Sequence, residues 1–252
     1  SGFDPLARST RFMLTEEAHH MFVGETGVGR VVQRSAELTK QDPNGDARKL
    51  GGVDLPTLQK YLNLWYSLSL DLFGSEISSN AAAFFAAGLK GRANEDKKYT
   101  DHKAIEGVYP MEVPKTGNPL VLEKQDVAIR NAMNEVLRDG YVEDCQRGVD
   151  RWNKTLDAAG LSFRFTLPSR RFHRAQGIFA NGRYAPDGTP LTQEQWDAKV
   201  NDWIPSAADK AYVKSLQAKS VTEPGKMANW IAAPAKGVDA KPVDFVYVRA
   251  EA

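Results

Sequence analysis

The chain has 252 residues, of which 42% are hydrophobic and 26% charged, as in an ordinary globular protein. Its 33 lysines and arginines nearly balance 32 aspartates and glutamates, which argues against a nucleic-acid partner recruited by overall charge. The single cysteine, Cys145, excludes an intrachain disulfide framework, and no apolar run is long enough for a membrane span. Because the N-terminus also lacks a signal-peptide pattern, we expect a cytoplasmic protein with no membrane contact.

The first predicted element is a long helix. Asp4-Pro5 places an N-cap residue before a proline in the first turn, and the helical pattern continues to about Ala36 or beyond. Inside this helix, residues 15–21 read Thr-Glu-Glu-Ala-His-His-Met, so Glu17 and His20 lie three residues apart and share one face. The other residues on or beside that face are apolar or small: Met13, Leu14, Met21, Gly24, Val28 and Val31.

This helix face predicts half of a metal site. An ionised carboxylate among apolar neighbours is costly unless it is paired, and a metal ion is such a partner. Glu-x-x-His on a bundle helix is how carboxylate-bridged di-iron proteins supply ligands, so we expect Glu17 and His20 to be catalytic metal ligands. Glu16, four residues before His20, is placed to accept a hydrogen bond from the imidazole N–H that does not face the metal. The alternative is a Glu–His pair that hydrogen-bonds internally and holds no metal.

Further helices are predicted where apolar residues recur at helical spacing or where capping residues stand, at about 55–73, 81–89, 126–160 and 205–218. Thr192 to Gln195 form a capping box that begins one more short helix.

The remaining segments predict loops and a small amount of β structure. Residues 91–119 are polar and contain three prolines, so we expect a long loop there. Phe163, Phe165 and Leu167 alternate with polar residues, which predicts a half-buried strand. Turn sequences at 181–182 and 186–188 extend this into a β excursion over 162–190. Residues 245–248 are a further candidate edge strand.

The predicted fold is therefore mostly α: part of a helical bundle with a small β ribbon. We expect two regions, a helical one at 1–160 and an extension of β-hairpin and short helices at 161–252.

A group of arginines is the second candidate site. Residues 169–174 read Ser-Arg-Arg-Phe-His-Arg, and guanidinium groups suit phosphate oxygens and planar bases. We predict that this group binds substrate together with arginines on the expected ribbon, the full set being Arg164, Arg170, Arg171, Arg174 and Arg183. The alternative is a solvated charged face.

Residues 1 to about 40 closely resemble the oxygenase components of aerobic benzoyl-CoA 2,3-epoxidases, which are di-iron oxygenases with a ferritin-like four-helix core. The resemblance is strongest in Arg-Phe-Met-Leu-Thr-Glu-Glu-Ala-His-His-Met, and it continues to Arg-Arg-Phe-His-Arg-Ala-Gln-Gly. It implies that Glu17 and His20 are iron ligands and that Glu16 is the acid behind them. It also implies a chain that completes a ferritin-like di-iron core.

The resemblance further implies an enzyme that uses O2 to epoxidise the ring of benzoyl-CoA or a similar acyl-CoA. A separate flavin/iron–sulfur reductase would supply the electrons. The helices that carry the other iron ligands are not among these residues, so we expect the chain to be the C-terminal half of such an oxygenase and inactive alone. The competing hypothesis is a non-catalytic helical binding or scaffold protein whose Glu17 and His20 bond to each other.

Overall fold

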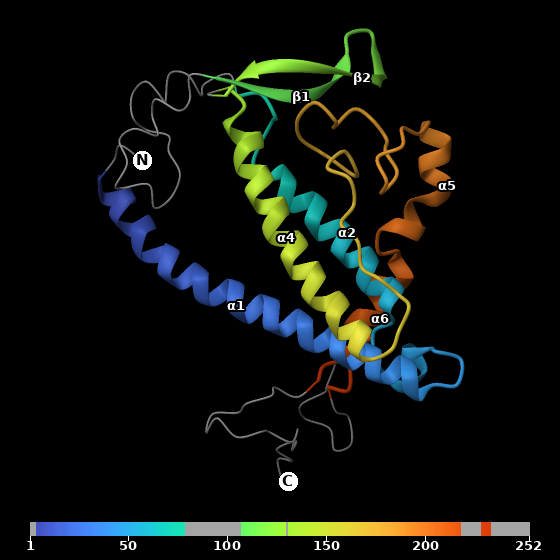
Figure 1. Ribbon diagram of the computed structural model, residues 1–252. Helices are drawn as coiled ribbons and strands as arrows, with labels where there is room; N and C mark the ends of the chain where they lie inside the picture. Colours follow the sequence, from blue (N-terminus) through green and yellow to red (C-terminus); the bar gives the residue numbers. More distant parts are fainter. Residues whose placement is uncertain (1–3, 79–106, 130, 218–227, 233–252) are drawn as a thin grey trace. The chain divides into compact units, whose positions relative to one another are not determined.

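The computed structural model describes residues 4–78, 107–129, 131–217 and 228–232 (Figure 1). Most of them are helical, which confirms the predicted class. The helices are α1 (Asp4–Gln41), η1 (Ala47–Leu50), α2 (Leu55–Asp71), α4 (Met133–Ala158), α5 (Gln193–Trp203) and α6 (Ala207–Gln217), and the strands are β1 (Val108–Lys115) and β2 (Asn118–Ala128). The predicted elements at 81–89 and 245–248 lie outside the described residues.

The chain forms two compact units, each made from segments that are distant in sequence. The first contains residues 1–18, 65–145 and 168–199, and the second contains residues 19–64, 146–167 and 200–252. The helices α1, α2 and α4 each contribute to both. The predicted regions at 1–160 and 161–252 stay a prediction, because these units are defined by compactness and not by function.

The capping box predicted at Thr192 is confirmed. The hydroxyl of Thr192 accepts a hydrogen bond from the Gln195 N–H at 3.2 Å, and the Gln195 side chain accepts one from the Thr192 N–H at 2.9 Å. These two bonds satisfy donors that the first turn of α5 leaves free. Among the described residues, no helix is long and apolar enough to cross a membrane.

The strand predicted at 163–167 is wrong: this segment is extended but pairs with no strand. Its backbone bonds instead to two side-chain amides. Asn153 exchanges two hydrogen bonds with the backbone of Phe165, at 2.8 and 2.9 Å, and Gln59 does the same with Thr166, at 3.0 and 2.8 Å. The alternation was nevertheless meaningful, since Phe165 is buried in the core of the second unit with Val32, Leu55, Val149 and Leu156.

The β ribbon lies instead at 108–128, where a loop and the start of a helix were predicted. β1 and β2 pair antiparallel, from Val108 opposite Ala128 to Lys115 opposite Asn118, and join through a tight turn (Figure 1). Pro110 and Pro114 argued against a strand because proline has no N–H. In a two-stranded ribbon every second N–H points outward and needs no partner, so both prolines are tolerated. Only an isolated bridge, Tyr184 with Pro190, occurs in the predicted 162–190 excursion.

Candidate functional site

The Glu-x-x-His pair lies where the sequence predicted, on α1. Glu17 and His20 are one helical turn apart, Glu16 lies four residues before His20, and all three are exposed. The rings of His19 and His20 are 6.4 Å apart and tilted by 52°, so the adjacent histidines diverge around the helix.

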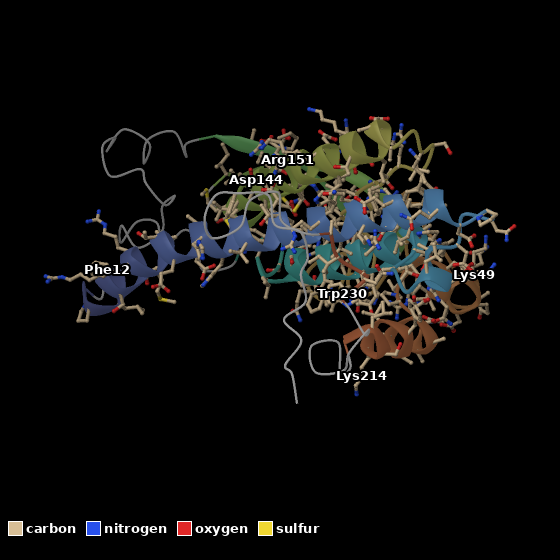
Figure 2. All side chains as sticks on the ribbon, turned by 90° about the horizontal axis from the view of Figure 1, so that it is seen from below. Phe12, Lys49, Asp144, Arg151, Lys214 and Trp230 are labelled. Carbon is tan, nitrogen blue, oxygen red and sulfur yellow. The ribbon has the colours of Figure 1, made fainter. Side chains whose placement is uncertain are left out.

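The first half of α1 carries several large apolar side chains that are exposed. Phe12 is 79% exposed and Met21 is 67% exposed, and Figure 2 shows Phe12 projecting from the helix. Glu17 and His20 therefore lie among apolar side chains that are themselves exposed in the described residues. The side chains on this half of α1 face solvent there, which is unusual for apolar residues grouped on one helix.

The donor set on α1 suits a metal but is incomplete. A carboxylate and an imidazole at i and i+3 are ligand types that iron accepts. Within the described ranges, no group of three or more His, Cys, Asp or Glu side chains is arranged to hold a metal ion. The residue types of the pair suit part of a metal site, and the half-site stays a prediction.

The second candidate site is built around the segment 169–178, which we call the arginine segment. It is fixed to the end of α2 by one carboxylate. Asp71 accepts hydrogen bonds from Arg174 Nε at 2.6 Å, from the Ala175 N–H at 2.9 Å and from the Gln176 N–H at 3.2 Å. The Arg174 side chain is completely buried. Arg174 therefore anchors the segment, and its guanidinium is already paired.

A second carboxylate, Glu76, holds the next turn. Glu76 Oε2 accepts a hydrogen bond from the Ile178 N–H at 2.7 Å, and Oε1 lies 3.0 Å from Arg174 Nη1. Gly177 allows this close approach because it has no Cβ and a φ of 84°.

Arg138 of α4 completes this buried network. Its guanidinium donates to the Leu70 carbonyl at 3.2 Å and to the Gly74 carbonyl at 2.7 Å, so it supplies donors to carbonyls around the end of α2. It also pairs with Glu135 and lies 3.6 Å from Glu76, and none of its side chain is exposed. Burial raises the pKa of Glu135 despite the charge of Arg138.

Arg170 and Arg171 point toward a pocket of about 220 Å³, which we call the arginine pocket. It lies between β1, the start of α4 and the arginine segment, and its lining includes Glu76, Tyr109, Met111, Glu112, Glu135, Arg170, Arg171 and Phe179. Both arginines are already paired: Arg170 with Asp139 and with Glu135 at 3.4 Å, and Arg171 with Glu112.

Tyr109 of β1 extends the polar wall by donating a hydrogen bond to Asp139. Burial and this bond raise the pKa of Tyr109 to about 12, so the phenol stays protonated near neutral pH. Burial lowers the pKa of Arg170, but the hydrogen bond and charge of Asp139 together with the charge of Glu135 raise it, and the net shift is upward. The wall is therefore a chain of ion pairs and hydrogen bonds.

The structure does not bring all five predicted arginines together. Arg164 belongs to the second unit, where it pairs with Asp157 and donates to the Phe163 carbonyl at 2.7 Å. Arg183 lies in the first unit and donates to the Gln193 side chain at 3.0 Å. Of the five, only Arg170 and Arg171 line the arginine pocket.

The sequence analysis did not identify the charged residues that pair with the arginine segment. Glu135, Arg138 and Asp139 stand at i, i+3 and i+4 on α4, a spacing that places them on one helix face. The spacing indicates the shared face, but it does not reveal which distant residues pack against that face. Glu112 and Tyr109 were missed because their segment was predicted to be a loop.

Fold and site together define a mostly helical protein with a Glu-x-x-His pair on its longest described helix and a separate polar pocket. No family model matches the chain. Over 252 residues, 99% of its length, the chain is 50% identical to benzoyl-CoA oxygenase component B of Aromatoleum evansii. It spans about half the length of that relative, 52%. The resemblance found in the sequence is thereby confirmed over almost the whole chain.

Proposed function

We propose that this chain is part of a di-iron oxygenase that epoxidises the aromatic ring of benzoyl-CoA or a related acyl-CoA. The observation that carries the proposal is the 50% identity over 252 residues to a benzoyl-CoA oxygenase component. When bound, the iron pair would supply redox chemistry with O2, using electrons from a separate reductase. The other ligands and the rest of a ferritin-like core would come from the remainder of the full-length protein.

In this proposal, Glu17 and His20 hold one side of the iron pair. Their spacing directs a carboxylate oxygen and a ring nitrogen the same way from α1. Glu16 accepts the other imidazole N–H of His20 and so fixes which nitrogen faces the metal. The other ligands would come from the part of the full-length protein that this chain, at 52% of its relative's length, does not span.

The exposed apolar half of α1 supports this assignment. A bundle helix leaves its core face uncovered wherever its partner helices are missing. Met13 and Met21 lie on or beside the helix face that carries Glu17 and His20, and they are 59% and 67% exposed. Once covered, these side chains would keep water away from the metal ligands.

The proposal is tested by iron content in the full-length protein. Glu17→Ala and His20→Ala should each lose most of the bound iron and the oxygenase activity while helicity by circular dichroism stays near normal. His19→Ala is the matched control, since it removes an imidazole from the adjacent position and should keep the iron. Full iron occupancy in Glu17→Ala would reject the ligand assignment and favour the scaffold hypothesis.

For the substrate, we propose that the predicted arginine group acts through Arg170 and Arg171. This assignment is supported by their position, because both residues line the arginine pocket. Arg174 would act indirectly, by anchoring the arginine segment to Asp71 and Glu76. A Michaelis constant for the acyl-CoA, measured in Arg170→Met and Arg171→Met, tests this assignment; each should rise roughly tenfold, equivalent to about 1.4 kcal/mol.

A further inference from the structure

The arginine pocket has a charge balance that restricts its ligand. The ion-pair network that lines and surrounds the pocket contains four guanidinium groups and five carboxylates. The guanidinium groups are those of Arg138, Arg170, Arg171 and Arg174, and the carboxylates are those of Asp71, Glu76, Glu112, Glu135 and Asp139. Four positive charges against five negative charges leave an excess of one negative charge. The pocket is thus not an open cluster of positive charge, although its sequence suggested one.

We infer that the arginine pocket holds an uncharged, hydrogen-bonding chain of amides and hydroxyls, such as the pantetheine arm of coenzyme A, and not a phosphate. The choice of coenzyme A as the carrier rests on the proposed function. The chemistry of the ligand rests on the pocket itself.

A phosphate is disfavoured because no arginine of the pocket is free to receive it. A phosphate bound to Arg171 would lie beside Glu112, and one bound to Arg170 would lie beside Asp139, so each would meet a like charge. Either contact adds up to two negative charges to a wall that already has more acids than bases. The raised pKa of Glu135 shows that burial already disfavours negative charge in this wall.

An amide matches the groups at the pocket mouth. The side chains of Glu112 and Arg171 are 51% and 23% exposed, so a ligand reaches both. A carboxylate accepts an N–H or O–H, and a guanidinium donates to a carbonyl, so the pair offers one acceptor and one donor. An amide supplies the complementary donor and acceptor without adding charge.

The volume of the arginine pocket and its apolar lining both suit a narrow, extended ligand. Met111 and Phe179 are buried and line the pocket, and the Arg171 guanidinium lies 6.0 Å from the centre of the Phe179 ring. These surfaces suit methylene and methyl groups between the amides. About 220 Å³ is less than the roughly 300–1,000 Å³ of pockets that enclose drug-sized ligands, so a segment of the carrier fits and the whole carrier does not.

The test compares the two halves of coenzyme A as separate ligands of the full-length protein. Pantetheine carries the amides, and adenosine 3′,5′-bisphosphate carries phosphates. Binding of each is measured by calorimetry in the unchanged protein, in Arg171→Met and in Glu112→Gln. Lys214→Met, an exposed cation of α6, is the matched control.

We expect Arg171→Met to weaken pantetheine roughly tenfold, the effect of one lost hydrogen bond to a charged group, and to leave the bisphosphate unchanged. Glu112→Gln keeps an acceptor and frees Arg171 from its acid, so it distinguishes the two ligand classes directly. Tighter bisphosphate binding in Glu112→Gln is expected, because the acid that disfavours phosphate is gone. If the unchanged protein binds the bisphosphate, and Arg171→Met weakens that binding and spares pantetheine, the pocket is a phosphate site and the inference is rejected. Pantetheine binding that neither variant changes also rejects it.

The outcome is separable from that of the proposed function. Calorimetry requires no turnover, so Arg171-dependent pantetheine binding in a protein that oxidises no acyl-CoA would support the pocket and reject the oxygenase. Turnover of an acyl-CoA together with pantetheine binding that is indifferent to Arg171 would support the oxygenase and reject the pocket.

Discussion

The carboxylate of Glu76 lies in the space that a side chain at Gly177 would occupy. A Cβ built on Gly177 would come within 1.9 Å of Oε2 of Glu76, the oxygen that accepts the Ile178 N–H. The packing of Glu76 against Gly177 fixes the C-terminal end of the arginine segment. It needs both the carboxylate of Glu76 and the missing side chain of Gly177.

Gly177→Ala should therefore lower the free energy of unfolding by more than backbone strain alone. An alanine at positive φ costs roughly 1–2 kcal/mol, and displacing a packed carboxylate adds about 1–3 kcal/mol. Gly117→Ala is the matched control, since its φ is 82° and no atom lies near its Cβ position. Denaturant titration of both variants checks this; equal losses would show that Glu76 moves aside freely.

Arg138→Met should be among the most destabilising single changes in α4. It leaves Glu135 with a buried, poorly compensated charge and removes the donor to the Gly74 carbonyl and one of the two donors to the Leu70 carbonyl, so we expect a loss of roughly 3–5 kcal/mol. Arg151→Met, on the same helix, breaks an ion pair with Glu25 whose side chains are about half exposed, and should cost less than about 1 kcal/mol. Similar losses in both variants, measured by denaturant titration, would contradict the buried role of Arg138.

His173 should make the first unit less stable in mild acid. Burial lowers the pKa of His173 below its ordinary value of 6.5, and the ring stacks on Trp196 at 5.9 Å. A lowered pKa in the folded state favours the neutral ring, so this contribution to stability is present above about pH 6.5 and is lost as pH falls through the lowered pKa.

The measurement for His173 is thermal unfolding between about pH 7 and pH 5, with His173→Asn as the comparison. Asparagine tolerates the left-handed backbone at this position, where φ is 51°. The midpoint of the unchanged chain should fall more steeply with decreasing pH than that of His173→Asn. Parallel curves would mean that His173 does not titrate differently in the folded state.

The 252-residue chain alone should bind iron weakly. Glu17 and His20 supply two ligands, and the described residues contain no group of three. Two ligands give neither the charge nor the coordination number of a carboxylate-bridged pair. Equilibrium dialysis against ferrous iron should show much less than two tightly bound ions per chain, and stoichiometric tight binding would reject the half-site.

The helices were predictable because their signals are local. Apolar spacing and the Thr192 capping box indicate helices from a few consecutive residues, and α2, α5 and α6 begin close to where those signals place them. The ribbon was not predictable in this way, because a strand tolerates Pro110 only if it has a free edge, and the fold sets that edge. Residues 163–167 were misjudged because the amides of Asn153 and Gln59 replaced a partner strand, which no strand propensity encodes.

The site was predictable in its residue types and not in its pairing. Glu17 and His20 could be selected because their relation is set by helix geometry alone. The arginines looked alike in sequence, yet the structure separates buried Arg174 from Arg171 at the pocket mouth. That difference depends on acids such as Asp71, whose separation from Arg174 by 103 residues conceals the contact in the sequence.

The chain leaves the first unit after Cys145 and returns at Pro168, and this order has a consequence during synthesis. At translation rates of roughly 5–20 residues per second, Asp71 is made about 5–20 seconds before Arg174. During that interval the end of α2 and the carboxylates beside it have no arginine segment to hold. Ribosome-bound chains that stop short of residue 178 should therefore expose this end of α2 to proteases, and extension by a few tens of residues should protect it.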